Sequence, residues 1–486
     1  MSYIAGVDRE QAVLFPESLD EYIAEESVVR FLDAFVETLE MDRLGFERAR
    51  PAATGRPGYD PRDLLRLYLY GYLHRVRSSR MLERECQRNV EVMWLLRKLR
   101  PDHKTIADFR RDHAGALKQT GREFVLLCKR LDLFGGELVA IDGSKFRASN
   151  AKQKSYTRAE LEKLQRKADE KISAYLAELD RADQVEGRTE PEERLSAQEL
   201  KAKIEALKSR KDEYTALLGG MEAGQSQISL TDAESRRMKV GSGTAVCYNV
   251  QIAVDSKHHL ICAQEVTNQE NDFHQLASMA EAAQEALQVD GLVVTADAGY
   301  HEEEELARCE AMQIETYVPR PQVVKTKGRD VYPKSAFTYE AEHDGYRCPA
   351  GALLSFRHEG KKQGKTLRYY RSAACATCPL RAKCTTEKQG RRIARTPLEH
   401  IVERAAERLK AKPQRRRERW CLAEHPFGSM KGWMGQGSFL LRGLRKVRGE
   451  FSLTVLSYNL RRAIRVLGVG PLLEAVRRGR PVLIGG

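Results

Sequence analysis

The chain has 486 residues, of which 42% are hydrophobic and 31% are charged, and its formal net charge is +13. A single hydrophobic core rarely grows to this size, so we expect several structural units. The basic excess favours a polyanionic partner. No apolar run reaches the length of about 18 residues that a membrane span needs, and the first residues lack the pattern of a signal peptide. Because most of the cysteines are scattered singly, we expect a cytoplasmic protein without a disulfide framework.

Residues 1–135 are predicted to form a helical DNA-binding domain. Apolar residues recur at helical spacing from Ser18 to Arg130. Asp60 and Pro61 have the character of an N-cap and a first helical residue. Several short helices with Arg and Lys on their polar faces are typical of a helix-turn-helix-like module. A plain helical bundle with solvated charges fits the same pattern, so both interpretations stay open.

A mixed pattern of strands and helices follows. The apolar run 138–141 is a predicted buried strand that ends in Asp142, and the run 292–296 is a second one that ends in Asp297. Between these strands, the pattern predicts a hairpin of 246–254 with 260–266 and a helix that begins near Leu276. After the second strand, it predicts a helix at 302–312 and a strand at 314–318. Residues from Thr396 onward are again predicted to be helical.

Three segments stand outside this pattern. Residues 151–225 are rich in Ala, Glu, Lys, Arg and Leu and predict an antiparallel helical hairpin with a polar turn at 187–193. Such a hairpin could dimerise, contact DNA or act as a spacer, and an inert insertion fits equally well. Residues 326–394 are predicted to be a small zinc-ribbon-like insertion, irregular as far as Gln389, that holds a cysteine cluster. Residues 471–486 are predicted to be a tail rich in Gly and Pro.

The two strand-end aspartates suggest a metal-dependent site. In open sheets, chemistry gathers where side chains leave the strands, and an unpaired buried carboxylate is costly. Hard divalent cations prefer carboxylate oxygens, and two such ions can clamp the attacking and leaving oxygens of a phosphodiester. Asp142 and Asp297 are therefore candidate metal ligands. The alternative is that each aspartate only caps the turn that follows it.

The order of these elements resembles the ribonuclease-H-like fold, an α/β fold with a mixed sheet. The late segment Glu424-His425-Pro426-Phe427-Gly428-Ser429-Met430-Lys431 resembles the signature of DDE transposases of bacterial insertion sequences. Further stretches and the N-terminal helices resemble the same family, which extends the likeness over most of the chain: 139–145, 248–251, 266–268, 271–272, 295–300 and 439–444. The tyrosine that this signature usually has upstream is replaced by arginines at 415–417.

The resemblance implies a catalytic core built from residues 136–150, 226–325 and 395–470. It implies Asp142, Asp297 and Glu424 as catalytic residues and as ligands of two Mg²⁺ or Mn²⁺ ions. Lys431 and Arg419 are implied contacts to DNA phosphates near the cut; Lys431 lies two helical turns after Glu424. The implied activity is metal-dependent cleavage at the ends of the element, followed by transfer of the freed 3′-hydroxyl to target DNA. The implied partners are double-stranded terminal inverted repeats and target DNA at the nucleoid, bound by at least a dimer.

The cysteine cluster suggests a structural zinc site. Four thiols that fall in a short, turn-rich stretch include one C-x-x-C pair: Cys348, Cys375, Cys378 and Cys384. Four thiolates suit tetrahedral zinc, and a segment poor in apolar residues needs such a constraint to become ordered. The alternative is four free thiols in a loop.

A cationic run leads into the segment that contains Glu424. Arg416 and Arg417 lie in it, and few acidic residues compensate it, so we expect it to contact a phosphate backbone. Three other functions remain open: a nuclease of the same fold without strand transfer, a sequence-specific DNA-binding regulator, and an interaction scaffold. Joining of a cut end to target DNA would separate the transposase from the nuclease, and a regulator would not need its three carboxylates.

Overall fold

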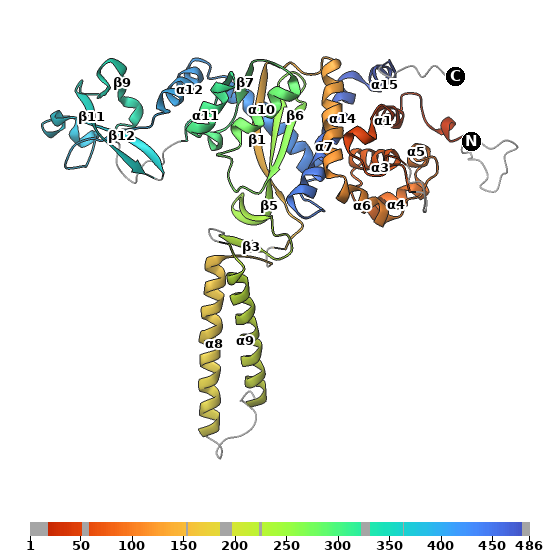
Figure 1. The fold of residues 1–486 in the computed structure, drawn as a ribbon, viewed down its shortest axis with the longest axis horizontal. Coiled ribbons are helices and arrows are strands. Elements are labelled where there is room, and N and C mark those ends of the chain that lie inside the picture. The colour runs from red at the N-terminus through yellow and green to blue at the C-terminus, as the bar shows by residue number, and fades with distance from the viewer. Residues whose placement is uncertain are drawn as a thin grey trace, which may run out of the picture.

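A computed structural model describes residues 18–50, 58–151, 154–184, 197–222, 226–321, 331–362 and 364–478. The chain has an α/β architecture, as expected, with a central mixed sheet, a bundle of helices at one side, a small second sheet at the other and two long helices that project from the body (Figure 1). Among the described residues, no helix is long and apolar enough to cross a membrane.

The N-terminal part is helical, as the sequence predicted. Its elements are η1 (Leu19–Tyr22), α1 (Val28–Glu37), α2 (Met41–Leu44), α3 (Pro61–Leu73), α4 (Ser79–Arg88), α5 (Val90–Leu95), α6 (His103–Asp112) and α7 (Ala114–Arg130). The predicted start of α3 is confirmed, because the Asp60 side chain accepts a hydrogen bond from the Arg62 amide and Pro61 opens the helix. The first seventeen residues of the predicted domain 1–135 lie outside the described residues.

The central sheet is built from β1 (Leu138–Arg147), β4 (Arg236–Val240), β5 (Gly243–Asp255), β6 (Ile261–Thr267), β7 (Leu292–Thr295) and β8 (Ile314–Tyr317). Its order is β4-β5-β1-β7-β8, and β6 also pairs with β5. β5 runs antiparallel to β1, β4 and β6, whereas β7 runs parallel to β1 and β8. The predicted hairpin is thus confirmed as β5 and β6, and the two strands predicted to carry aspartates are direct neighbours.

The first of these strands is longer than predicted. We expected it to end at Asp142, but β1 continues to Arg147, with Asp142 opposite Ile252 of β5. The antiparallel partner β5 holds the extra residues, whereas β7 pairs only with 138–140. Ala140 is in register with Thr295, so Asp142 and Asp297 each stand two residues beyond the last parallel pair. The two acids therefore leave the parallel part of the sheet at the same level.

Helices cover both faces of this sheet. Within the described residues these include α10 (Leu276–Leu287), α11 (Glu303–Ala311), α12 (Glu399–Ala411), α13 (Arg415–Gly428) and α14 (Leu444–Leu467). Leu422 and Ala423 of α13 pack on Leu138 and Ala140. These two residues lie on the same face of β1 as Asp142, because side chains two positions apart in a strand share a face. α14 contacts β6, α3 and α7, and joins the sheet to the N-terminal helices.

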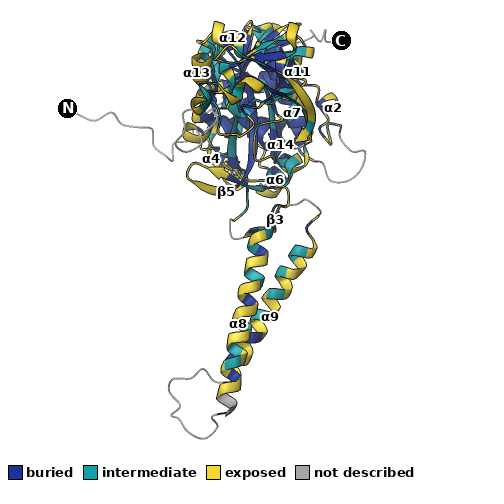
Figure 2. Cartoon of the chain, turned by 90° about the vertical axis from the view of Figure 1, so that its left-hand side faces the viewer, coloured by how far each residue is buried: buried dark blue, intermediate teal, exposed yellow. Residues whose placement is uncertain are grey.

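The predicted helical hairpin consists of α8 (Arg158–Gln184) and α9 (Ala197–Gly219), which rise from a small two-stranded sheet of β2 (Ser155–Thr157) and β3 (Gln227–Ser229). The two helices lie side by side, project away from the body and are exposed over most of their length (Figure 2). A few apolar residues, among them Leu179, Leu200 and Ile204, pack between them. The predicted turn at 187–193 lies outside the described residues.

Two further segments differ from the sequence prediction. The stretch expected to be irregular, 326–394, contains an antiparallel five-stranded sheet of β9 (Thr338–Glu340), β10 (Gly345–Arg347), β11 (Leu353–Lys362), β12 (Lys365–Arg371) and β13 (Ile393–Arg395). Five buried residues form its core: Phe337, Tyr346, Leu354, Tyr370 and Ile393. The predicted tail begins as helix α15 (Val469–Arg478), which packs near α1, and its last eight residues lie outside the described part.

Candidate active site

Two acidic residues and one arginine meet at the end of the parallel strands. Nη2 of Arg419 lies 3.9 Å from Oδ2 of Asp142, and Nη1 of the same guanidinium lies 3.7 Å from Oδ2 of Asp297. Arg419 is positioned by α13, whose first residue accepts a hydrogen bond through its carbonyl from the Thr295 hydroxyl of β7. The structure therefore brings the two predicted strand-end acids together, with one cation between them.

Asp142 sits in an environment that disfavours an isolated charge. Its side chain is 15% exposed, and burial raises the pKa of Asp142 to about 6. The guanidinium of Arg419 opposes this rise in pKa, the Asp297 carboxylate adds to it, and the Gly143 amide, which donates to Asp142 Oδ1, opposes it. Nη1 of Arg419 is buried and has no hydrogen-bond partner among the described residues. The Asp142 carboxylate could therefore bind a cation, and the free Nη1 of Arg419 could donate to an anion.

A third acid, Asp272, also lies at this site, although the sequence analysis gave it no role. Its Oδ1 accepts hydrogen bonds of 2.7 Å from Asn249 Nδ2 and 2.6 Å from Gln251 Nε2, and Lys145 Nζ lies 3.7 Å away. Asp272 is close enough to Asp142 to raise the pKa of that carboxyl. The signal was present in the sequence, because Asn249 and Gln251 are polar residues that alternate with apolar ones along the strand predicted at 246–254.

Gly143 has no side chain, and this lets Asp272 and its hydrogen-bond partners pack directly against β1. A Cβ atom at Gly143 would lie 2.5 Å from Gln251 Nε2, 2.8 Å from Asp272 Oδ1 and 3.0 Å from the Tyr300 hydroxyl. Tyr300 is fully buried and donates a hydrogen bond to Gln251 Oε1. The residue after Asp142 therefore has to be a glycine for the Asp272 network to pack against β1.

α13 carries three more of the predicted site residues, Glu424, Arg416 and Arg417. Glu424 is exposed, and its side chain makes no hydrogen bond or ion pair within the part of the chain that the structure describes. Arg416 and Arg417 are exposed near the start of the helix. The prediction placed Lys431 on a continuous helix, but α13 ends at Gly428 and a π-helical turn, Ser429–Trp433, follows.

Lys431 nevertheless contacts the strand that carries Asp142. Its ammonium group donates to Ser144 Oγ at 2.6 Å and to the Lys145 carbonyl at 2.9 Å. Ser144 is two residues after Asp142 and so lies on the same face of β1. The π-helical turn therefore brings Lys431 to the acidic site from the far end of α13.

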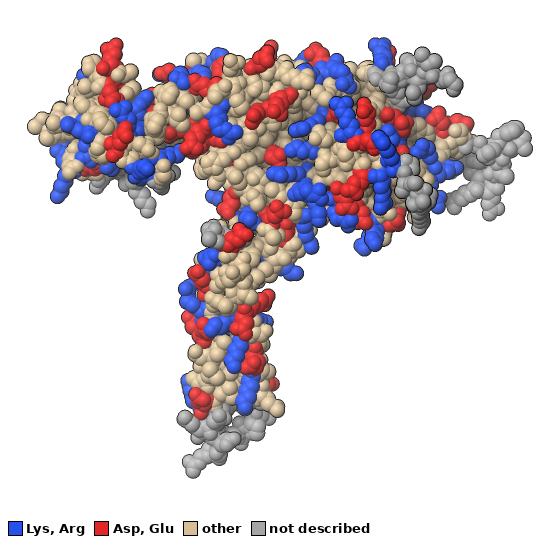
Figure 3. Space-filling view, in the orientation of Figure 1, with Lys and Arg blue, Asp and Glu red and all other residues tan. Residues whose placement is uncertain are grey.

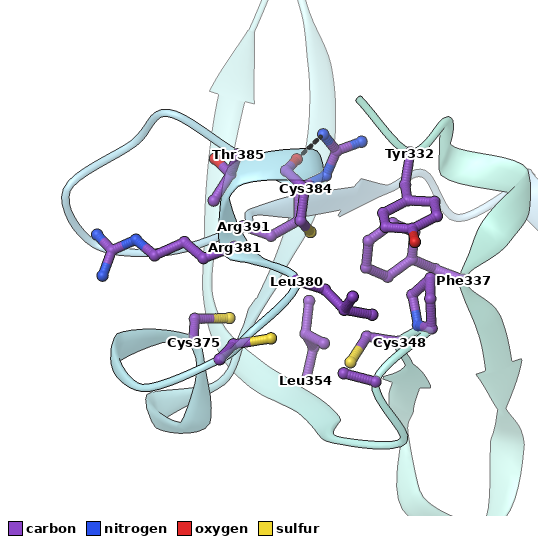
Figure 4. A pocket seen from close by; sticks show the side chains of 13 residues that line it. Tyr332, Phe337, Cys348, Leu354, Cys375, Leu380, Arg381, Cys384, Thr385 and Arg391 are labelled. Atoms are coloured by element: carbon purple, nitrogen blue, oxygen red, sulfur yellow. Dashed lines mark hydrogen bonds between the residues drawn. The ribbon is translucent and has the colours of Figure 1, made fainter. Parts of the chain in front are cut away.

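The four clustered cysteines line one small pocket at the small sheet. Cys348 lies in the turn after β10, and the other three lie beyond β12. Figure 4 shows the side chains of Cys348, Cys375 and Cys384 turned toward the same space, beside Leu380. All four thiols are half-buried, and burial, together with the other three thiols, raises the pKa of Cys384. The structure thus brings together three chain segments that carry the predicted thiols.

Neither cluster has the arrangement of a formed metal site. Across the described ranges, no group of three or more His, Cys, Asp or Glu side chains is close enough to hold a metal ion.

The charges of the body are mixed in sign, but Lys and Arg gather where the central sheet meets the N-terminal helices (Figure 3). On the face of the projecting helices that Figure 3 shows, residues of both signs are interspersed.

Two protein families match the chain. Residues 347–464 match a family described as "Transposase DDE domain", and residues 17–112 match one described as "Transposase domain". The first match includes three strands of the small sheet, β11 to β13, with α13 and most of α14, and the second covers most of the N-terminal helices. No curated protein and no solved structure matches the chain. With an acid pair at the sheet and a match to a transposase domain on each side of it in the sequence, these findings support a DDE transposase of an insertion sequence.

Proposed function

We propose that the chain binds the terminal inverted repeats of its insertion sequence and catalyses metal-dependent cleavage and strand transfer of DNA. The observation that carries this proposal is the convergence of Asp142 and Asp297 on Arg419 at the end of the parallel strands. The element order, in which a hairpin, a helix and a second acidic strand follow the first, supports a ribonuclease-H-like core.

The acid pair fits a hard divalent cation. Oδ1 of Asp297 accepts a hydrogen bond from the Gly299 amide. Oδ2 of each acid faces the Arg419 guanidinium. Mg²⁺ characteristically binds through one or two carboxylates and completes its shell with water and substrate phosphates. Asp142 and Asp297 would hold the ions together with Glu424, whose helix packs on the same face of β1. When bound, two Mg²⁺ or Mn²⁺ ions supply stabilisation of the charge on the attacking and leaving oxygens.

The chain's own basic residues would orient the DNA. Lys431, held by Ser144 on β1, is a point charge for the phosphate next to the cut. Arg416 and Arg417 are exposed one turn before Arg419 and would contact the backbone further along. Arg419 would exchange its two carboxylates for a phosphate as cations enter, because guanidinium suits both anions.

The remaining parts complete the proposal. The N-terminal helices, 1–135, would bind the terminal repeats, and the core of 136–150, 226–325 and 395–470 would cut them. Cys348, Cys375, Cys378 and Cys384 would bind a structural Zn²⁺ that orders the small sheet, whose five-residue core is small for a free-standing unit. At least a dimer is needed because two ends must be held at once.

The test uses labelled duplexes that carry the ends of the element, with Mg²⁺ or Mn²⁺, resolved on a sequencing gel. Wild type should cut at the repeat end and join a pre-cut end to plasmid DNA. Asp142→Asn, Asp297→Asn and Glu424→Gln should bind but not cut. Glu342→Gln, an exposed acid on the small sheet, is the matched control and should act like wild type.

Each failure points to a different alternative. Cutting without joining would identify a nuclease of the same fold. Specific binding without cutting by wild type would identify a DNA-binding regulator, and cutting that survives all three substitutions would refute the site.

A further inference from the structure

A pocket of about 600 Å³ lies apart from the acidic site, where three distant parts of the chain meet. The end of α3, the π-helical turn after α13 and the C-terminal half of α14 contribute to its walls. The pocket has no acidic residue in its lining but has three arginines from two successive turns of α14, namely Arg461, Arg462 and Arg465. A concave, basic surface of this kind suits an anionic ligand.

An exposed tryptophan organises the arginines. The guanidinium carbon of Arg461 lies 3.1 Å from the ring centroid of Trp433, and that of Arg75 lies 3.8 Å from the same centroid. The indole is still 43% exposed. Cation–π attraction to one ring therefore holds two like charges close together at the rim of the pocket.

No carboxylate compensates these charges. Arg75, Arg461 and Arg465 make no ion pair with any of the described residues. Burial lowers the pKa of Arg461, and the neighbouring Arg75 and Arg465 lower it further. By contrast Arg77, only two residues after Arg75, is paired with the buried Glu450 at 2.7 Å. Arg77, which links the N-terminal helices to α14, thus has a carboxylate partner, whereas the arginines at the pocket have none among the described residues.

Arg75 also occupies a backbone position that favours glycine. It follows the C-cap of α3 with a φ of 65°, and the next amide, of Val76, donates to the Gly71 carbonyl. Glycine is the usual residue at such a left-handed helix end, and a side chain there costs about 1 kcal/mol. An arginine in this position is explained if its side chain has a task in the pocket.

We propose that this arginine pocket, lined by Arg461 and Arg465 and bordered by Arg75 on the Trp433 ring, binds the phosphodiester backbone of duplex DNA as a second contact outside the acidic site. The inference rests on the proposed function and extends it. The π-helical turn connects the two sites, because it carries Lys431 to β1 at one end and Trp433 to the pocket at the other. DNA that leaves the acidic site along this turn would meet the arginines next. The N-terminal helices, which the transposase domain match covers, form the far wall.

The test is equilibrium binding of a labelled duplex of element-end DNA over a range of salt concentrations. Arg461→Gln/Arg465→Gln should bind more weakly, and the slope of log affinity against log salt should fall by about 1 for each lost phosphate contact. The matched control is Arg357→Gln/Lys361→Gln, which removes two exposed charges from β11 at the opposite end of the molecule (Figure 1). Its salt slope should equal that of wild type.

Arg75→Gly separates binding from folding. It should unfold at the same temperature as wild type or higher, because glycine relieves the left-handed backbone, and yet bind DNA more weakly. A salt slope that falls equally in the control pair would mean that affinity follows net charge alone and would overturn the pocket. So would pocket variants that bind like wild type while wild type binds and cuts, an outcome that leaves the proposed function intact. Wild type that binds polyglutamate but not the duplex would overturn both.

Discussion

The ammonium group of Lys431 donates a 2.6 Å hydrogen bond to the hydroxyl of Ser144, and this contact ties the π-helical turn after α13 to the strand that carries Asp142. A π-helical turn inserts an extra residue into the helical repeat and is frequent at functional sites. Here it redirects the chain, so that a lysine beyond the end of the helix reaches the face of β1 on which the acid lies.

If Lys431 contacts DNA, its positive charge should contribute more to cleavage than its hydrogen bond to Ser144, the tether that fixes it to β1. We expect Lys431→Gln to reduce the rate of end cleavage at least tenfold, because a hydrogen bond to a charged phosphate is worth about 1.5–3 kcal/mol. Ser144→Ala removes only the tether and should cost far less activity, while Lys431→Arg should retain part of it. Equal losses in Lys431→Gln and Ser144→Ala would mean that the lysine acts only by fixing the turn.

Arg419 should compete with metal for the acid pair. Because its guanidinium lies within 4 Å of both carboxylates, it lowers the affinity of the site for a divalent cation. We expect Arg419→Gln to bind Mn²⁺ more tightly, on the order of tenfold, in a titration followed by electron paramagnetic resonance, although DNA cleavage should fall. Arg416→Gln, an exposed neighbour on α13, is the control for loss of one positive charge. An equal gain in that variant would assign the effect to net charge.

The pair of acids was predictable from the sequence, but its geometry was not. An apolar run followed by aspartate is visible at 138–142 and at 292–297, whereas the register that sets the two acids at one level depends on pairing between strands about 150 residues apart. Asp272 was missed because it lies in the loop between β6 and α10, and its neighbours Asn249 and Gln251 reach it only in the folded sheet.

The small sheet was missed for a different physical reason. Three of its strands have only three residues, β11 is mostly exposed, and its core consists of single residues spread from Phe337 to Ile393. No stretch alternates for long enough to give a strand signal, and the Gly and Pro residues around Cys348 favour turns. Similarly, the tail was expected from its Gly and Pro residues, but Leu472, Leu473 and Val476 lie on one face and are buried as a helix.

The glycine after Asp142 provides a test of the Asp272 network. Gly143→Ala would place a methyl group 2.8 Å from Asp272 Oδ1 and 2.5 Å from Gln251 Nε2, so the network must shift. We expect a loss of about 1–3 kcal/mol in the free energy of unfolding, measured by urea denaturation, together with weaker Mn²⁺ binding. Gly121→Ala makes the same change inside α7 in open space and should be neutral or stabilising by up to about 1 kcal/mol. A fully stable Gly143→Ala variant would show that the cluster is looser than the contacts imply.

The cysteine pocket can be tested by metal analysis of the purified protein. If the four thiols bind Zn²⁺, the protein should carry about one equivalent, as is typical of a four-cysteine structural site, and a strong chelator should lower its unfolding temperature. Cys375→Ser should abolish the bound zinc, because three thiolates leave the ion open to water and exchange. The matched control is Cys421→Ser, which changes an exposed cysteine on α13 and should leave the zinc content unaltered. Gly390→Ala gives a second variant beside the pocket, since a Cβ there would lie 2.5 Å from Cys375 Cβ and would displace that thiol. Zinc-free protein with an unchanged unfolding temperature would establish four free thiols, and the buried aromatic core of the small sheet would then have to hold it without a metal.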